Sequence, residues 1–406
     1  MKTSDLRAPR IEGRARGAAT PCRWTALAAT TLRRRARALL ATTAMATAFV
    51  AHAAEIVVGQ VAPLTGVLST TGQQMVLGGR VCFDWVNDHG GVNGARIVTV
   101  VADDGYDVAR TEQATRALVA RPEVVALFGL AGTANVARLL DDRVLADAGV
   151  ALVAPYTGGE ALRTPFNPWI FHVRASYARE AEHMVHQLDT LGIHRIALLY
   201  QDDGFGLSGK VGIEAALARR GQALAAAAPY QRNTGDVAQA VRTIIAAHAQ
   251  AVIMVAVNKP AAAFVKAYRE GGGGGQLFNV SVVDPAELVR LAGIDNARGL
   301  GISQVVPYPY GDALPVVREF QAALRRYAPG QAVNYTNFEE YLGAKVLVEA
   351  LRRAGPNPTR GRVLAALESL RAFDLGGMTV SFGPRERVGS TFVEVTVIGG
   401  DGRLLK

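Results

Sequence analysis

Residues 56–66 read IVVGQVAPLTG, an apolar run that ends in a loop of proline, threonine and glycine. Similar apolar runs follow at residues 97–102, 124–129 and 150–154, with helical patterns between them. Continuous apolar runs, in place of alternating ones, are typical of parallel strands that helices cover on both faces. Strand–helix alternation of this kind predicts a doubly wound α/β sheet with right-handed crossovers.

A second series of the same units begins after a break near residues 171–176. Its expected strands are 195–200, 251–257, 277–282 and 301–306. Two series predict two parallel-sheet lobes, each about the size of a small sheet with its helices. The expected lobe limits are 54–174 and 305–372 for lobe 1, 175–304 for lobe 2, and 373–406 for C-terminal strands that return to lobe 2.

The net charge of +9 comes almost entirely from the beginning of the chain. Of the 44 Lys and Arg and the 35 Asp and Glu, ten basic and two acidic residues lie within residues 1–53. The remaining 34 basic and 33 acidic residues give the rest of the chain a net charge of +1. A nucleic-acid surface needs clustered surplus positive charge in the folded part, so we expect no nucleic-acid partner.

Residues 33–53 have the three parts of an export signal. The basic segment RRRAR at 33–37 precedes an uncharged, mostly apolar stretch at 38–51, and Ala51 and Ala53 stand where a signal peptidase reads small residues. A transmembrane anchor is the alternative, but the run is shorter than the ~20 residues that span a bilayer. We predict cleavage after Ala53 and a periplasmic protein, in which Cys82 remains as a single thiol.

Polar loops follow the strands of the first series. The loops at 62–72, 103–106, 130–135 and 155–159 are rich in hydroxyl groups, glycine and exposed backbone. Ligands of open α/β sheets lie beyond the carboxyl ends of the strands, and a helix N-terminus there can hold a carboxylate without Arg or Lys. Serine and threonine also cap helices throughout proteins, so the prediction of a small-molecule site depends on the four loops together.

Six stretches in fixed order carry a family resemblance: 58–66, 83–94 (FDWVNDHGGVNG), 103–104, 126–135 (ALFGLAGTAN), 153–157 and 200–206 (YQDDGFG). Together they resemble the leucine/isoleucine/valine-binding family of periplasmic solute receptors, which serve ABC importers. The resemblance extends from about residue 55 to the C-terminus. It implies a type I periplasmic binding fold, the "Venus flytrap", with two lobes joined by three hinge crossings and a ligand bound by closure.

The resemblance assigns candidate ligand contacts to the loops after the third and fourth strands. Thr133 and the adjacent backbone of Ala134 and Asn135 are expected to hold a ligand carboxylate. In the next loop Thr157, beside Tyr156, is expected to supply a hydroxyl donor.

Four further contacts complete the expected site. Thr71 and Tyr106 stand in the first two loops, Phe205 follows the first strand of lobe 2, and Asp284 follows its third. The family's acid that pairs with an α-ammonium falls near residues 282–284, where Val282 and Val283 occupy the closest positions. The resemblance therefore leaves amides and aromatic acids open as solutes beside branched-chain amino acids.

These features predict a binding protein with no catalysis, no cofactor and no metal. The expected partners are a small carboxylate-bearing solute and the membrane permease subunits of an ABC importer, and we expect a monomer. A sensor domain of the same fold that signals to a partner is the alternative. An exported hydrolase is the third reading, but no Ser/His/Asp or paired-carboxylate constellation follows the strands.

Overall fold

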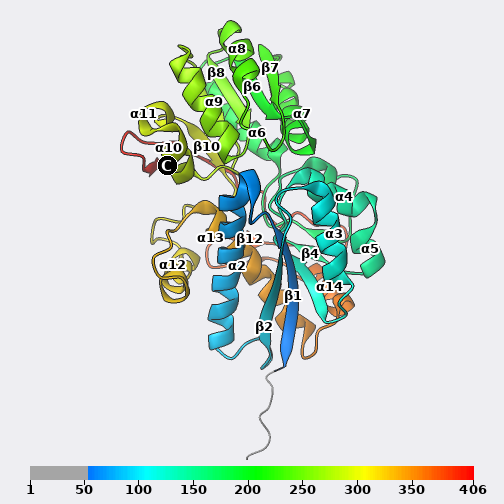
Figure 1. Cartoon of the computed structure of the whole chain (residues 1–406). Coiled ribbons are helices and arrows are strands. Elements are labelled where there is room, and N and C mark those ends of the chain that lie inside the picture. The colour runs from blue at the N-terminus through cyan, green and yellow to red at the C-terminus, as the bar shows by residue number, and fades with distance from the viewer. Residues whose placement is uncertain (1–53) are drawn as a thin grey trace, which may run out of the picture. The chain divides into compact units, whose positions relative to one another are not determined.

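The computed structural model describes residues 54–406, and the predicted signal peptide lies outside them. The first large sheet is fully parallel (Figure 1). Its strands, in spatial order, are β2 (Arg96–Asp103), β1 (Glu55–Ala62), β3 (Val124–Phe128), β4 (Leu152–Val153) and β5 (Ile170–Phe171). Seven of the eight residues of β1 and all five of β3 are buried, as expected for strands covered on both faces.

The second large sheet has parallel strands and an antiparallel edge. In spatial order it contains β14 (Leu404–Leu405), β13 (Glu394–Ile398), β10 (Gly301–Gln304), β9 (Gln276–Asn279), β8 (Ala251–Val255), β6 (Ile196–Gln201) and β7 (Ala226–Tyr230). From β10 to β7 every pairing is parallel, whereas β13 runs antiparallel to β10 with Gly301 opposite Val397. The last strands of the chain therefore cover the edge of the second sheet.

Helices cover both sheets. The first sheet carries α2 (Ser69–Asp88), α3 (Val108–Val119), α4 (Thr133–Asp141), α5 (Val144–Ala148), α12 (Pro315–Tyr327), α13 (Tyr335–Ala354) and α14 (Arg360–Glu368), with short 3₁₀ turns η1 (Gly66–Leu68) and η2 (Glu160–Leu162). The second carries α6 (Tyr177–Thr190), α7 (Gly204–Ala218), α8 (Ala238–Ala246), α9 (Asn258–Glu270), α10 (Pro285–Ala292) and α11 (Ile294–Ala297). The predicted two-lobed α/β class is thus confirmed.

Helices α2 and α13 lie side by side (Figure 1), although about 260 residues separate them in the chain. Gly78 of α2 allows this contact, because a Cβ at that position would lie 2.1 Å from the carbonyl oxygen of Asn337 in α13. Asn334 is the N-cap of α13 and forms a capping box with Asn337. The Asn334 side chain accepts from the backbone N–H of Asn337, and the Asn337 side chain accepts from the backbone N–H of Asn334. The late helix α13 is therefore an integral part of lobe 1.

The chain crosses between the lobes three times, after β5, after β10 and before β13. The small hairpin of β11 (Phe373–Asp374) and β12 (Thr379–Val380) pairs with neither large sheet. Phe382 follows this hairpin in the chain. The centroid of its ring lies 5.2 Å from the centroid of the Phe171 ring in lobe 1. From the sequence we expected the strands of residues 373–406 to return to lobe 2. In the structure, strand pairing with the second sheet begins at Glu394.

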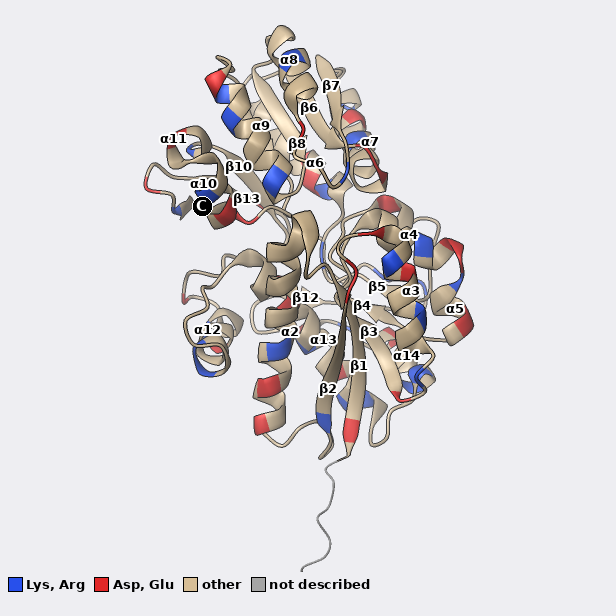
Figure 2. Cartoon of the chain, in the orientation of Figure 1, with Lys and Arg blue, Asp and Glu red and all other residues tan. Residues whose placement is uncertain are grey.

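Basic and acidic residues are interspersed over both lobes in the view of Figure 2. This distribution agrees with the near-neutral net charge of the chain after residue 53. Within residues 54–406 no helix combines the length and apolar character needed to cross a membrane.

Candidate ligand-binding site

A cavity lies between the lobes, at the carboxyl ends of strands from both sheets. The volume that it leaves open to a water-sized molecule is about 10 Å³, far below the roughly 300–1,000 Å³ that is usual for small-molecule sites, so the two lobes nearly fill it in this structure. Its walls are formed by Leu68, Tyr106, Gly132, Tyr156, Tyr177, Phe205, Val257 and Val282. The dominance of aromatic and aliphatic side chains suits a small solute with an apolar body.

Gly132 forms the wall from which α4 begins. Its φ of 98° is in the region that favours glycine, and a Cβ there would lie 2.4 Å from Asn135 Oδ1 and 2.8 Å from the Tyr106 ring. No side chain caps α4, since its N-cap residue is this glycine. The first turn of α4 therefore brings N–H groups and partial positive charge to the cavity wall, which is the chemistry that binds a carboxylate.

Thr133, the residue after Gly132, contacts Thr157 through its side chain. Their hydroxyl oxygens are 2.7 Å apart and both side chains are buried. The Thr157 hydroxyl also accepts from the N–H of Gly159 at 3.1 Å. The structure brings these two predicted residues together, but as a mutual hydrogen bond next to the cavity and not as part of its lining.

The aromatic wall contains three of the predicted residues, Tyr106, Tyr156 and Phe205. The Tyr156 hydroxyl lies 3.1 Å from the Thr336 hydroxyl, and the Phe205 ring packs on Tyr177 with centroids 5.3 Å apart. Burial raises the pKa of both Tyr106 and Tyr156. Both phenols therefore stay neutral around pH 7 and present hydroxyl dipoles without charge.

The other predicted contacts have different roles. Thr71 is buried and accepts a long hydrogen bond, 3.4 Å, from Asn258 Nδ2 of lobe 2. Ala134 follows Thr133 in the first turn of α4, opposite the start of α7 in lobe 2, where a Cβ on Gly204 would lie 3.7 Å from its nitrogen. Asp284 lies outside the cavity lining and caps α10, accepting from the N–H of Glu287 at 2.8 Å.

Asn135 belongs to a contact across the lobes that centres on Arg232. The Arg232 guanidinium extends from lobe 2, where it pairs with Asp203 at 2.5 Å. Its Nη2 donates to the Tyr106 carbonyl at 2.6 Å and to Asn135 Oδ1 at 2.7 Å, and its Cζ lies 3.9 Å from the centroid of the Tyr106 ring. Gln201 of lobe 2 also donates to the Tyr106 hydroxyl at 3.2 Å. These contacts fasten the two lobes beside the cavity.

A buried ionic cluster lies behind the tyrosines at the first crossing. Arg174, which is 1% exposed, places its guanidinium 5.0 Å from the centroid of the Tyr156 ring and 3.4 Å from both Glu180 and Glu339. Glu180 belongs to lobe 2 and Glu339 to lobe 1, so Arg174 links both at the hinge. Burial raises the pKa of Glu339 to about 7, even though Arg174 acts in the opposite direction.

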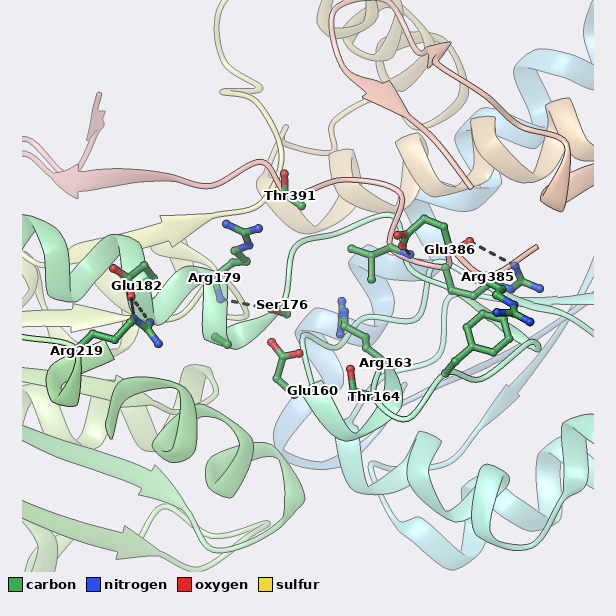
Figure 3. Close-up of a pocket in the computed structure, with 14 residues that line it drawn as sticks. Glu160, Arg163, Thr164, Ser176, Arg179, Glu182, Arg219, Arg385, Glu386 and Thr391 are labelled. Atoms are coloured by element: carbon green, nitrogen blue, oxygen red, sulfur yellow. Dashed lines mark hydrogen bonds and ion pairs between the residues drawn. The ribbon is translucent and has the colours of Figure 1, made fainter. Parts of the chain in front are cut away.

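A larger hollow lies at the first and third crossings (Figure 3). It holds about 780 Å³, and its fourteen lining residues include five arginines and three glutamates. Glu182 pairs with Arg219, and Arg387 pairs with Glu368 at 2.5 Å. Arg219 is exposed and Arg387 is buried, and none of the residues that line this hollow belongs to the loops at 62–72, 103–106, 130–135 and 155–159. The smaller apolar cavity is therefore the better candidate site.

Sequence reasoning missed several functional positions. Leu68, Tyr177 and Val257 line the cavity, and nothing in their sequence context separates them from core residues, whereas the family resemblance had already pointed to the position of Val282. Arg232 stands in a polar loop after β7, a strand that was not predicted. Arg174 did carry a signal, because it is a charged residue within the otherwise apolar run at 170–175.

Comparison with known proteins agrees with this geometry. Residues 55–401 match the family model described as "Periplasmic binding protein". A Leu/Ile/Val-binding protein homolog 8 of Brucella suis is 25% identical over 363 residues, which cover 83% of this chain and 86% of the relative.

Two solved structures have the same fold. A substrate-binding periplasmic protein of Ralstonia solanacearum is 40% identical with a TM-score of 0.83, covering 86% of this chain and 99% of that one. A possible leucine/isoleucine/valine-binding protein of Rhodopirellula baltica is 30% identical with a TM-score of 0.84, covering 88% and 98%. With two lobes, three crossings and a cavity between them, the chain belongs to the periplasmic binding protein family, in its leucine/isoleucine/valine-binding branch with the type I fold.

Proposed function

We propose that this protein captures a small carboxylate-bearing solute in the periplasm and delivers it to the permease subunits of an ABC importer. The observation that carries the proposal is the cavity whose walls come from both lobes, with the first turn of α4 opening at Gly132. A carboxylate can bind to the N–H groups of that turn, with the Thr133 hydroxyl beside it once its bond to Thr157 is exchanged.

The solute class follows from the groups around the cavity. None of the described residues that line it carries a carboxylate, and Val282 stands where the family resemblance places the acid that pairs with an α-ammonium. Asp284 is occupied as the cap of α10. Leaving an ammonium group without a counter-charge in a buried site is costly. The favoured solute is therefore a branched or aromatic monocarboxylate without an α-amino group.

Closure is the proposed mechanism of capture. Solute held by lobe 1 would gain contacts with Phe205, Val257 and Val282 of lobe 2 only when the lobes meet, so binding shifts the population toward the closed form. Arg232 adds contacts that exist only in that form. The permease would recognise the closed protein, and no chemical step takes place. Cleavage after Ala53 would release the protein into the periplasm.

Matched pairs of solutes test this proposal. In calorimetry with purified protein, 4-methylpentanoate is compared with leucine, and phenylacetate with phenylglycine, each pair differing by the α-amino group. We expect the amino-free acid of a pair to bind at least tenfold more tightly. Tighter binding of the amino acid would overturn the solute class but keep the receptor function. Failure of both classes, and of amides, to bind would overturn the proposed capture of carboxylates.

A further inference from the structure

The hollow at the first and third crossings (Figure 3) is large enough for an organic molecule. Its volume of about 780 Å³ is within the roughly 300–1,000 Å³ that is usual for small-molecule sites. Its wall residues lie within 160–166 of lobe 1, within 176–182 and at Arg219 of lobe 2, and within 385–391 of the third crossing. None of these described residues also lines the solute cavity. We call it the arginine hollow.

The arginine hollow has a surplus of positive charge. Its arginines are Arg163, Arg179, Arg219, Arg385 and Arg387, and its glutamates are Glu160, Glu182 and Glu386. Five arginines and three glutamates leave a surplus of two positive charges. Partners outside the lining do not change this surplus, because Arg220 pairs with Glu182 and Glu368 pairs with Arg387. The charge of the walls therefore favours an anion.

Two of these arginines keep their guanidinium groups without a hydrogen-bond or ion-pair partner within residues 54–406. Arg179 belongs to the first turn of α6, where its backbone N–H donates to the Ser176 hydroxyl at 3.4 Å. Arg385 stands at the tip of a tight turn that Gly383 and Glu386 close with two backbone hydrogen bonds. Both side chains are exposed. Exposed arginines are often solvated, so the case for a site depends on what lies between these two.

Arg163 lies between Arg179 and Arg385 in the view of Figure 3. Its guanidinium is held in place, because Nη1 donates to the carbonyl of Gly159 at 3.0 Å and Nη2 to those of Arg174 and Ala175 at 3.1 and 3.4 Å. Its Nε is buried and has no acceptor among the described residues. Buried donors are almost always paired. A fixed cation that lacks one acceptor points to an acceptor from outside the chain.

The beginning of α6 and an exposed ring add to the same walls. Ala178, the second residue of α6, lines the hollow, and the N-terminus of a helix carries partial positive charge. Phe166 is 46% exposed and lines the hollow from lobe 1. The walls thus combine positive charge with an apolar surface, which suits an organic anion better than a lone inorganic ion.

We propose that the arginine hollow binds an organic polyanion, a molecule with two or more phosphate or carboxylate groups, through Arg179, Arg163 Nε and Arg385, with its apolar part against Phe166. The planar guanidinium matches the oxygen atoms of both kinds of group. More than one anionic group is required because Arg179 belongs to lobe 2, whereas Arg163 belongs to lobe 1 and Arg385 to the third crossing. The site does not depend on the carboxylate solute proposed above.

The test uses inorganic pyrophosphate and citrate as probes, titrated by calorimetry near pH 7 at constant ionic strength, with acetate as the monovalent comparison. We expect saturable binding of at least one polyanion, and no saturable binding of acetate that the arginine substitutions alter. Arg179→Gln and Arg385→Gln should each weaken the binding about fivefold, the value of a partly exposed charge contact. Glu160→Gln, which removes a negative charge from the wall, should strengthen it.

Arg298→Gln is the matched control, because Arg298 is exposed and does not line the hollow. It should change the affinity less than twofold. The proposal is overturned if neither polyanion binds saturably, or if Arg298→Gln weakens binding as much as Arg179→Gln does, since the attraction would then come from net charge alone. It is also overturned if Thr133→Ala abolishes binding while Arg179→Gln and Arg385→Gln leave it unchanged, because the probe would then occupy the solute cavity.

Discussion

The guanidinium carbon of Arg232, in lobe 2, lies 3.9 Å from the centroid of the Tyr106 ring in lobe 1. The same guanidinium donates to the Tyr106 carbonyl and to Asn135, so one side chain makes three contacts across the lobes. Tyr106 is also a wall of the solute cavity. Tyr106 therefore takes part both in the contact between the lobes and in the wall of the cavity.

Arg232→Ala should weaken solute binding, because the contacts it removes form only when the lobes meet. Hydrogen bonds to charged groups contribute roughly 1.5–3 kcal/mol, which corresponds to a loss of tenfold or more in affinity. Calorimetry measures the affinity, and small-angle scattering with and without solute measures closure. Arg242→Ala is the control, since Arg242 is exposed and contacts only Gln239 of its own helix. An unchanged affinity in Arg232→Ala would show that the lobes close without this residue.

Thr133→Ala should weaken binding of the carboxylate solute by roughly 1–3 kcal/mol, the range for loss of a hydrogen bond to a charged group. The hydroxyl lies beside the first turn of α4 and exchanges its bond to Thr157 for one to the carboxylate. Calorimetry with the tightest acid of the matched pairs gives the value. Thr243, which is half-buried on α8 and does not line the cavity, provides the control substitution Thr243→Ala. Equal affinity in wild type and Thr133→Ala would remove Thr133 from the site.

Val282→Glu should change the preference of the cavity from amino-free acids to α-amino acids. The new carboxylate would face the solute where the wall is now aliphatic, and it would pair with an α-ammonium. Affinities for 4-methylpentanoate and leucine, measured in both proteins, should reverse in order. Val282→Gln, of similar size without charge, is the control. If leucine gains nothing in Val282→Glu relative to Val282→Gln, the side chain at position 282 does not decide the solute class.

Glu339→Gln should flatten the pH dependence of stability. The pKa of Glu339 is raised by burial from 4.5 to about 7, so the folded protein holds a proton that the unfolded chain releases at lower pH. The free energy of unfolding therefore falls as pH rises through about 4.5 to 7, on the order of 3 kcal/mol for this one group. Glutamine retains the shape and removes the titration.

Denaturant unfolding at several pH values between 4 and 8 checks this prediction. Glu349→Gln, a half-buried pair partner of Arg353 on the same helix, is the control and should leave the slope unchanged. The same slope in Glu339→Gln and in the wild type would assign the pH dependence to other groups of the hinge cluster, such as Glu340, whose pKa burial also raises.

Most of the fold could be predicted because it depends on apolar runs and helical periodicity, which can be recognised in a single sequence. The runs at 56–61, 124–129 and 251–257 correspond to the strands β1, β3 and β8. The strand β7 was missed because its sequence, AAAPY, has few β-branched residues and contains a proline. Proline is tolerated there because β7 is an edge strand.

The site was predicted less completely, for a physical reason. Loops that follow parallel strands can be placed at one edge of a sheet, and the family resemblance then indicated Tyr106, Tyr156 and Phe205 in or beside these loops. Which side chain of a loop points into the cavity depends on backbone angles such as the φ of Gly132, and sequence spacing does not encode these. Leu68 and Val257 look like core residues because a ligand cavity of this kind is itself apolar.

The antiparallel edge of the second sheet has a consequence for how the chain is made. Strand β10 is synthesised about 90 residues before β13, its partner on that side. Until the ribosome has released nearly the whole polypeptide, lobe 2 has a bare row of peptide groups along β10. Lobe 2 can therefore complete its sheet only after β13 has been synthesised.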